Sequence, residues 1–168
     1  MSRAFVNEDN QEEAPIIPPR APLPDGVPNY VTGKGLDLLK KERERLIEEI
    51  EQLHSLEDEK DKRYKMQLVK GKLALLEGRI NSARLPEVSE SEMHEVRFGA
   101  KVTLQFTKEN SKQSFQLVGV DEANVKEQKI AFTAPIAKAI TGKSVGDKAV
   151  LQLGKETRSM EIISIDYE

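Results

Sequence analysis

Four carboxylates lie within five positions of one short stretch, "HSLEDEKDKRYK", residues 54–65: Glu57, Asp58, Glu59 and Asp61. Carboxylate oxygens are the ligands that a hard cation such as Mg²⁺ prefers. Asp58, Glu59 and Asp61 are therefore candidates to share a magnesium ion with a partner. The competing interpretation is that the run is only the solvated bend between two helices, because charge runs usually lie on solvated surfaces.

The residues on either side predict the two helices that would position this acidic run. Each arm carries a stripe of residues at alternating spacings of three and four, broken once by Arg43. The apolar members are Leu36, Leu39, Leu46, Ile50 and Leu53, then Met66, Val69, Leu73, Leu76, Ile80 and Ala83. The first arm is mainly acidic and the second mainly basic, which favours their antiparallel pairing with each other. We expect an antiparallel coiled-coil hairpin over residues 32–84 in a monomer, with donation of the hairpin to an oligomer as the alternative.

Beyond residue 94 the pattern changes from helical to alternating. Predicted strands lie in "VRFGAKVTLQF", "SFQLVGV", "KIAFTA", "AVLQL" and "SMEIISIDY". One short helix is expected in "PIAKAITG", because Pro135 suits a first helical turn and Gly142 suits the position past the last. Residues 95–168 therefore predict a small domain of antiparallel strands with one short helix. With the hairpin and a linker over residues 85–94, the fold class is α+β.

The first 31 residues have a different composition. Six prolines lie between Pro15 and Pro28, and proline neither continues a helix nor pairs in a central strand. We expect an extended or disordered tail with polyproline character. The alternative is a tail that docks on a partner through Phe5, Ile16 and Ile17.

Composition excludes several classes of protein. The chain has no cysteine, which rules out disulfides, thiolate zinc sites and cysteine nucleophiles. Its formal net charge of −3 argues against coating nucleic acid through bulk charge. No signal peptide or membrane span is apparent, so we expect a cytoplasmic protein without membrane association. His54 and His94 have no nucleophile or metal-ligand spacing around them, so neither intrinsic catalysis nor a cofactor of the chain's own is expected.

The strand-rich segment resembles the C-terminal domain of the Gre family of bacterial transcription elongation factors. The stretches "EVRFGAKVTL", "FQLVGVDEA", "APIAKAITGK" and "VGDKAVLQL" occur in the family's order over about 70 residues. Within the hairpin, "VTGKGLDLLKKERERL" and "LLEGRINSARLPEV" are similar to the two ends of the family's coiled coil. The resemblance covers residues 30–168 and leaves the proline-rich tail outside.

This resemblance implies a coiled coil followed by an FKBP-like domain that grips the rim of the RNA polymerase secondary channel. The coiled coil would project inward, toward backtracked RNA. In cleavage-stimulating members, acidic residues at its tip help to hold a second magnesium ion at the polymerase active centre. The residues that match the family's rim-contacting loop are Thr133, Ala134, Pro135 and Ile136, with Asp121 and Glu122 nearby.

At the tip the sequence departs from the family's cleavage motif, Gly-Asp-Leu-x-Glu-Asn-Ala-x-Tyr. Only Leu56 and an offset Tyr64 match it. The hairpin is also shorter by about one heptad per arm, which at 1.5 Å per residue is roughly 10 Å. Magnesium ligands must lie within about 2.1 Å of the ion, so we expect a channel-binding regulator without efficient cleavage stimulation. A genuine cleavage factor that uses residues 57–61 is the alternative.

Two further classes are more distant alternatives. A prolyl isomerase needs an aromatic-walled pocket, and the domain offers only five aromatic residues, some of which must fill the core: Phe98, Phe106, Phe115, Phe132 and Tyr167. A nucleic-acid-binding protein, with DNA as one ligand, would use a basic patch near the base of the hairpin. Its residues would be Lys40, Lys41, Arg43, Arg45, Lys70, Lys72 and Arg79, although salt pairing between the arms explains them equally well.

Overall fold

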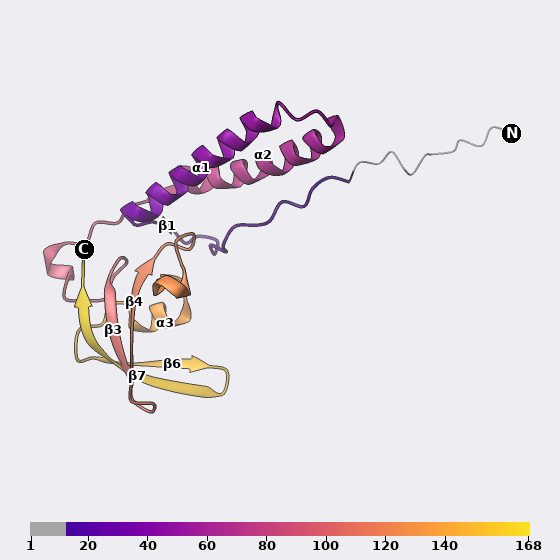
Figure 1. Cartoon of the computed structure of the whole chain (residues 1–168). Coiled ribbons are helices and arrows are strands. Elements are labelled where there is room, and N and C mark those ends of the chain that lie inside the picture. The colour runs from indigo at the N-terminus through magenta and orange to yellow at the C-terminus, as the bar shows by residue number, and fades with distance from the viewer. Residues whose placement is uncertain (1–12) are drawn as a thin grey trace.

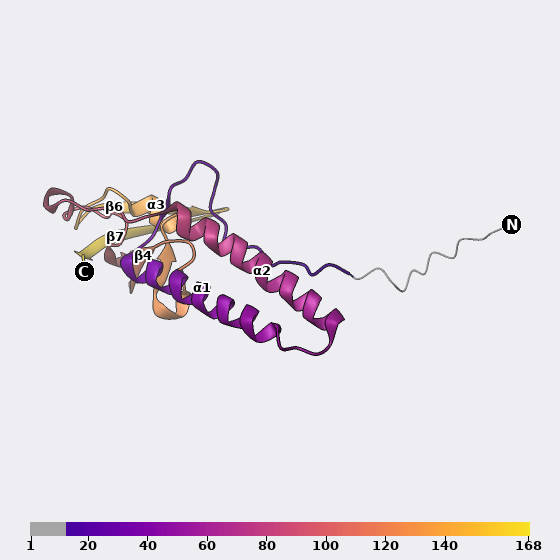
Figure 2. The same ribbon diagram turned by 90° about the horizontal axis from the view of Figure 1, so that it is seen from above.

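The computed structural model describes residues 13–168, in which a helical hairpin is joined to a β domain (Figure 1). The N-terminal elements are β1 (Asn29–Tyr30), α1 (Gly33–Leu53), α2 (Glu59–Ser82), β2 (Ala83–Arg84) and the short 3₁₀ helix η2 (Glu90–Glu92). The β domain contains β3 (Lys101–Phe106), β4 (Ser111–Val118), the 3₁₀ helix η3 (Val125–Glu127), β5 (Lys129–Ala131), α3 (Pro135–Ile140), β6 (Lys148–Leu153) and β7 (Glu156–Asp166). Both ribbon views show the hairpin projecting away from the sheet (Figures 1 and 2).

The two stripes form the core of the hairpin, as predicted. Buried side chains of both arms meet along the seam, and the other apolar stripe residues pack partly buried against them. The buried members in the helices are Leu39, Leu46, Leu53, Val69 and Leu76. Arg43, which interrupts the first stripe, reaches across to Glu77 at 3.1 Å. Its charge is therefore accommodated at the edge of the seam.

The β domain is a five-stranded sheet in the order β5-β4-β3-β7-β6. Three of its pairings are antiparallel, as expected. The pairing of β4 with β5 is parallel, so the sheet is mixed. The cause is the connection of residues 119–128, which carries the chain back before β5 begins beside Gln116.

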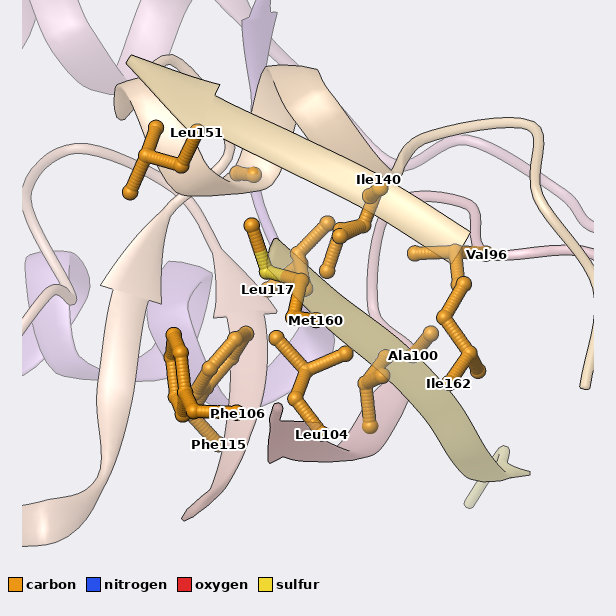
Figure 3. Close-up of a cluster of buried hydrophobic side chains, with 13 residues drawn as sticks. Val96, Ala100, Leu104, Phe106, Phe115, Leu117, Ile140, Leu151, Met160 and Ile162 are labelled. Atoms are coloured by element: carbon orange, nitrogen blue, oxygen red, sulfur yellow. The ribbon is translucent and has the colours of Figure 1, made fainter. Parts of the chain in front are cut away.

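The core of the β domain lies between the sheet and α3 (Figure 3). Ala137 and Ile140 of α3 are fully buried against the strands. The helix has Pro135 in its first turn, and Gly142 follows it with φ +83°. Both signals that predicted this helix are therefore present in the structure.

Residues 13–28 contain no helix or strand. The segment nevertheless does not leave the molecule but runs beside α2 in both views (Figures 1 and 2). It ends in β1, which pairs in parallel with β2 at the end of the hairpin. Ile17 lies against Gly71, whereas Ile16 is 90% exposed. Phe5 lies outside the described residues.

None of the helices within residues 13–168 has the length and apolar character that crossing a membrane requires.

Candidate functional site

At the tip of the hairpin, Asp58 caps the second helix. Its carboxylate accepts hydrogen bonds from the backbone N–H groups of Lys60 and Asp61, each at 3.0 Å. An aspartate in this position satisfies two of the free N–H groups that begin any helix. The bend therefore covers residues 54–58, and Glu59 and Asp61 lie in the first turn of α2.

The remaining tip carboxylates do not converge on one point. Asp61 pairs with Lys65 one turn along the helix at 2.8 Å, and Glu57 and Glu59 are exposed. Lys62 closes the bend by donating to the carbonyl of His54 at 3.0 Å. Within residues 13–168 no three aspartate, glutamate or histidine side chains are grouped closely enough to hold a metal ion. The four tip carboxylates are therefore spread around the bend and the first turn of α2.

The four residues of the predicted docking loop lie together where β5 leads into α3. Pro135 is exposed and Thr133 is half-buried, so both offer surface to a partner. Ala134 and Ile136 pack partly against the core of the domain. The backbone N–H of Ala134 donates to the carbonyl of Ala131 at 2.9 Å, which holds the loop against β5.

A cleft of about 640 Å³ lies beside this loop. Three aromatic rings form part of its wall, with centroids 5.4–5.7 Å apart: Tyr30, Phe98 and Phe132. Thr133 and Lys138 line the cleft from the side of α3. Sequence reasoning missed Tyr30, because it reaches the domain from the proline-rich segment rather than from the β domain itself. Phe106 and Phe115, by contrast, are buried in the core.

The linker also lines the cleft, through Pro86, Glu87, Val88 and Glu92. Its end is held by Tyr167, whose hydroxyl accepts from the backbone N–H of Arg97 at 2.9 Å and donates to the carbonyl of Glu95. Burial raises the pKa of the Tyr167 phenol above its ordinary value. Hydrogen bonds from Ser89 lower the pKa of the Glu92 carboxyl. The linker is therefore attached to the domain at a defined position.

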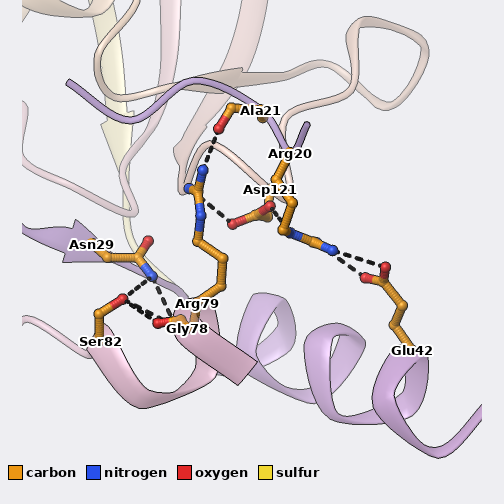
Figure 4. A network of polar contacts seen from close by, with 8 residues as sticks. All are labelled: Arg20, Ala21, Asn29, Glu42, Gly78, Arg79, Ser82 and Asp121. Carbon is orange, nitrogen blue, oxygen red and sulfur yellow. Dashed lines mark hydrogen bonds and ion pairs between the residues drawn. The ribbon is translucent and has the colours of Figure 1, made fainter. Parts of the chain in front are cut away.

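Asp121 lies at the base of the hairpin with its side chain only 7% exposed. It accepts from Arg20 of the N-terminal segment at 2.9 Å and from Arg79 of α2 at 3.3 Å (Figure 4). Arg20 also makes two hydrogen bonds to Glu42 of α1, at 2.9 and 3.1 Å. The hydrogen bonds to Glu42, with the nearby charge of Asp121, outweigh burial and raise the pKa of the Arg20 guanidinium. One carboxylate of the β domain thus holds both the N-terminal segment and the hairpin.

Glu122 makes a second connection at the same base, with its side chain 4% exposed. It accepts from the Thr32 hydroxyl at 2.6 Å and from the Lys129 ammonium at 3.4 Å. Burial, the largest single influence, lowers the pKa of Lys129, but the charges of Glu122 and Glu127 and the hydrogen bonds of the ammonium together outweigh burial and raise the pKa. A Cβ on Gly35 would lie 2.6 Å from the Glu122 carboxylate, so only glycine permits this approach to the start of α1.

The structure therefore places Asp121 and Glu122 differently from the four loop residues. Both were expected near a docking surface, yet their carboxylates are buried and bound to partners within the chain. Gly119, in the same stretch, lies so close to Tyr30 that an added Cβ would be 2.5 Å from its carbonyl oxygen. The stretch "VGVDEA" is accordingly a joint between the domain and the hairpin.

Two residues of the proposed basic patch have intrachain partners. Arg43 pairs with Glu77 and Arg79 with Asp121. This favours salt pairing over nucleic-acid binding for these two arginines.

Comparisons with known proteins identify the family. Residues 90–167 match the family model described as "Transcription elongation factor, GreA/GreB, C-term". The chain is 36% identical to the transcription elongation factor GreA of Hyphomonas neptunium over 104 residues, which is 62% of this chain and 66% of that protein. It is 30% identical to GreA of Methylococcus capsulatus over 152 residues, 82% of this chain and 96% of the relative.

Solved structures with similarity include Gfh1 of Thermus aquaticus, at 24% identity and a TM-score of 0.40, over 81% of this chain and 96% of that one. A GreA/GreB factor from Nitrosomonas europaea matches at 16% identity and a TM-score of 0.41, over 84% and 99% of the two chains. The match to GreA of Methylococcus capsulatus covers enough of the chain to include both the hairpin and the β domain. The chain therefore belongs to the GreA/GreB family of transcription elongation factors, which are non-enzymatic proteins that bind RNA polymerase.

Proposed function

We propose that this protein docks as a monomer on the rim of the RNA polymerase secondary channel through its β domain. Its hairpin then projects inward and occupies the channel, without efficient stimulation of transcript cleavage. Family membership supports polymerase binding as such. The manner of docking and the effect on cleavage are the parts that need experiment.

The arrangement of the tip is the observation that carries the second half of this proposal. Asp58 is engaged by two backbone N–H groups, and Asp61 is paired with Lys65. These contacts use Oδ1 of Asp58 and Oδ2 of Asp61, so turning either carboxylate toward a magnesium ion competes with the helix cap or with the Lys65 pair. Glu57 and Glu59 are exposed, yet they do not reproduce the spacing of the family's cleavage motif. Occupying the channel requires only the shape of the hairpin.

The docking half rests on the surface beside α3. Thr133 and Pro135 are accessible, and the aromatic cleft next to them offers an apolar hollow with Lys138 at its edge. An apolar centre surrounded by polar groups is the usual form of a protein–protein interface. Asp121 and Glu122 would act indirectly, by holding the hairpin against the docked domain.

The cleavage test uses a backtracked elongation complex with end-labelled RNA, assembled with and without the protein. The key variant is D58N/E59Q/D61N, because asparagine still caps a helix and the tip then loses charge without losing its fold. A matched variant, E44Q/E48Q/E49Q, removes the same charge from the exposed face of α1. We expect no rapid cleavage with any of the three proteins. Rapid cleavage by the wild type and the matched variant, lost only in the tip variant, would show that the protein is a cleavage factor.

The docking test introduces one arginine at a time and measures binding to core polymerase. T133R places a long charged side chain in the middle of the proposed docking surface. Because the residues that dominate binding lie near the centre of an interface, this variant should weaken binding to core polymerase about tenfold or more. V125R changes a residue that is 87% exposed on η3, outside the proposed surface. Equal binding by both variants would contradict docking through the loop at residues 133–136.

A further inference from the structure

We propose that residues 16–31, called the strap below, set the angle between the hairpin and the β domain. Arg20 and Asp121 act as its positioning residues. The strap lies outside the stretch over which the sequence resembles the family, apart from its last two residues. The inference concerns the protein alone; only its consequence for channel entry depends on the proposed function.

The hairpin and the sheet have little direct packing between them. Among the described elements, α1 packs on α2 and each strand packs on its neighbours, while neither long helix packs extensively on a strand of the sheet. A rigid rod attached by its end to a domain needs additional contacts to keep one direction. The strap and the two carboxylates at the base supply those contacts.

The central contact is the ion network of Arg20 (Figure 4). Its guanidinium binds Glu42 of α1 with one edge and Asp121 of the β domain with another, so a single side chain connects the strap, hairpin and domain. Arg79 of α2 donates to Asp121 and also to the carbonyl of Ala21 in the strap. The side chains of Arg20, Arg79 and Asp121 are 17%, 16% and 7% exposed, so solvent and salt screen this network only weakly.

The strap also has an apolar contact farther along the hairpin. A Cβ built on Gly71 would lie 1.9 Å from Cδ1 of Ile17, so the missing side chain of this glycine makes room for Ile17. Glycine inside a helix destabilises it relative to alanine. The strap provides a structural reason for that cost at residue 71. Gly78, two turns farther along the same face of α2, has no neighbour near its Cβ position.

At its other end, the strap joins the hairpin base through β1. Asn29 is 3% exposed, and its side-chain amide donates to the carbonyl of Arg79 at 2.9 Å and to the Ser82 hydroxyl at 3.2 Å (Figure 4). Tyr30 then packs against Phe98 and Phe132 of the β domain. The strap is therefore bound to the hairpin at both ends and to the domain at Asp121 and the aromatic cluster.

The angle is measured by pulsed electron spin resonance on the full chain, without polymerase. Since the protein has no cysteine, spin labels at Ser55→Cys in the bend and Lys108→Cys in the β3–β4 turn report one distance. We expect a narrow distance distribution in the parent protein. D121N should broaden and shift it, because two buried arginines then lose their shared counter-charge.

Release of the strap is measured separately, as the rate of trypsin cleavage between Arg20 and Ala21. Cleavage follows the population of the open form when opening is fast. In D121N we expect cleavage to accelerate about tenfold or more, the factor that corresponds to losing one hydrogen bond to a charged group. D121N does not alter the sequence around Arg20, so trypsin meets the same cleavage site in both proteins.

A second variant keeps the proposal testable if D121N does not fold. G71L fills the place of Ile17 from the helix and should accelerate cleavage and broaden the distance distribution, while G78L is its matched control and should change neither. Unchanged distances in G71L despite faster cleavage would overturn the positioning role. Unchanged cleavage and distances in both D121N and G71L would overturn the strap altogether. Because polymerase is absent, neither result bears on docking, and failure of docking would leave these results standing.

Discussion

The tip and the base of the hairpin both carry clusters of carboxylates, and the two clusters differ in what binds them. At the tip, Asp58 and Asp61 are held by groups within four residues of themselves, and the Asp61 side chain is 45% exposed. At the base, Asp121 is 7% exposed and binds Arg20, which lies 101 residues away in the sequence. The same residue type is thus local and solvated at one end, and long-range and buried at the other.

This difference separates carboxylates whose removal should disturb the fold from carboxylates whose removal should leave it largely intact. Exposed ion pairs contribute about 0–1 kcal/mol, because water and salt screen them. Removing one member of a buried pair leaves an uncompensated charge and costs several times more. The base should therefore dominate stability, while changes at the tip should act on function with little effect on the fold.

The largest effect should come from Asp121→Ala. Arg20 and Arg79 would remain mostly buried without their shared counter-charge, which should lower the free energy of unfolding by about 3 kcal/mol. For a chain of this size the melting temperature should fall by roughly 6–12 °C. Urea denaturation followed by circular dichroism measures the change, with Asp61→Ala as the control. A loss below about 1 kcal/mol would mean that Glu42 alone can neutralise the arginines, and the contrast between base and tip would fail.

The next largest loss of stability should come from the cap of α1, and the cap of α2 serves as its comparison. Thr32→Ala removes the cap of α1 and one of the two bonds to buried Glu122, and should cost about 2 kcal/mol. Asp58→Ala removes only an exposed cap and should cost about 1 kcal/mol. Thr32→Ser keeps the hydroxyl and should restore most of the loss. Thermal melting measures both losses. Equal losses of stability in the two alanine variants would show that the hydrogen bond from Thr32 to Glu122 does not stabilise the protein.

The sequence predicted the features that depend on neighbouring residues and missed the contacts between distant residues. The stripes of the hairpin, the short helix between Pro135 and Gly142, and the acidic bend all depend on neighbours in the sequence, and periodicity and turn chemistry report them. The partners of Asp121 come from the N-terminal segment and from α2, which no local pattern connects. The same holds for Tyr30, which reaches Phe98 and Phe132 only after the chain has folded.

One local signal did point toward the base, although sequence reasoning did not use it. Arg20 is the only charged residue between Glu13 and Asp25, in a stretch otherwise made of proline, alanine, isoleucine and leucine. Disordered segments combine low hydrophobicity with high net charge, so a stretch with one charge among apolar residues departs from that composition and favours a packed position. Gly71 inside a predicted helix was a second signal, since glycine there is costly unless something approaches it closely.

The smallest contribution to stability should come from the ion pair between Asp61 and Lys65 on α2. A double-mutant cycle with Asp61→Asn and Lys65→Gln should give a coupling free energy of about 0.3–0.5 kcal/mol, the usual value for exposed pairs one turn apart. High salt should reduce that coupling, because both side chains are nearly half exposed. A parallel cycle with Arg20→Gln and Glu42→Gln at the base should give a larger coupling that resists salt, since Arg20 is 17% exposed. If the tip pair proved as strong and as resistant to salt as the base pair, Asp61 would be committed to the fold, and its removal could no longer be read as a test of function alone.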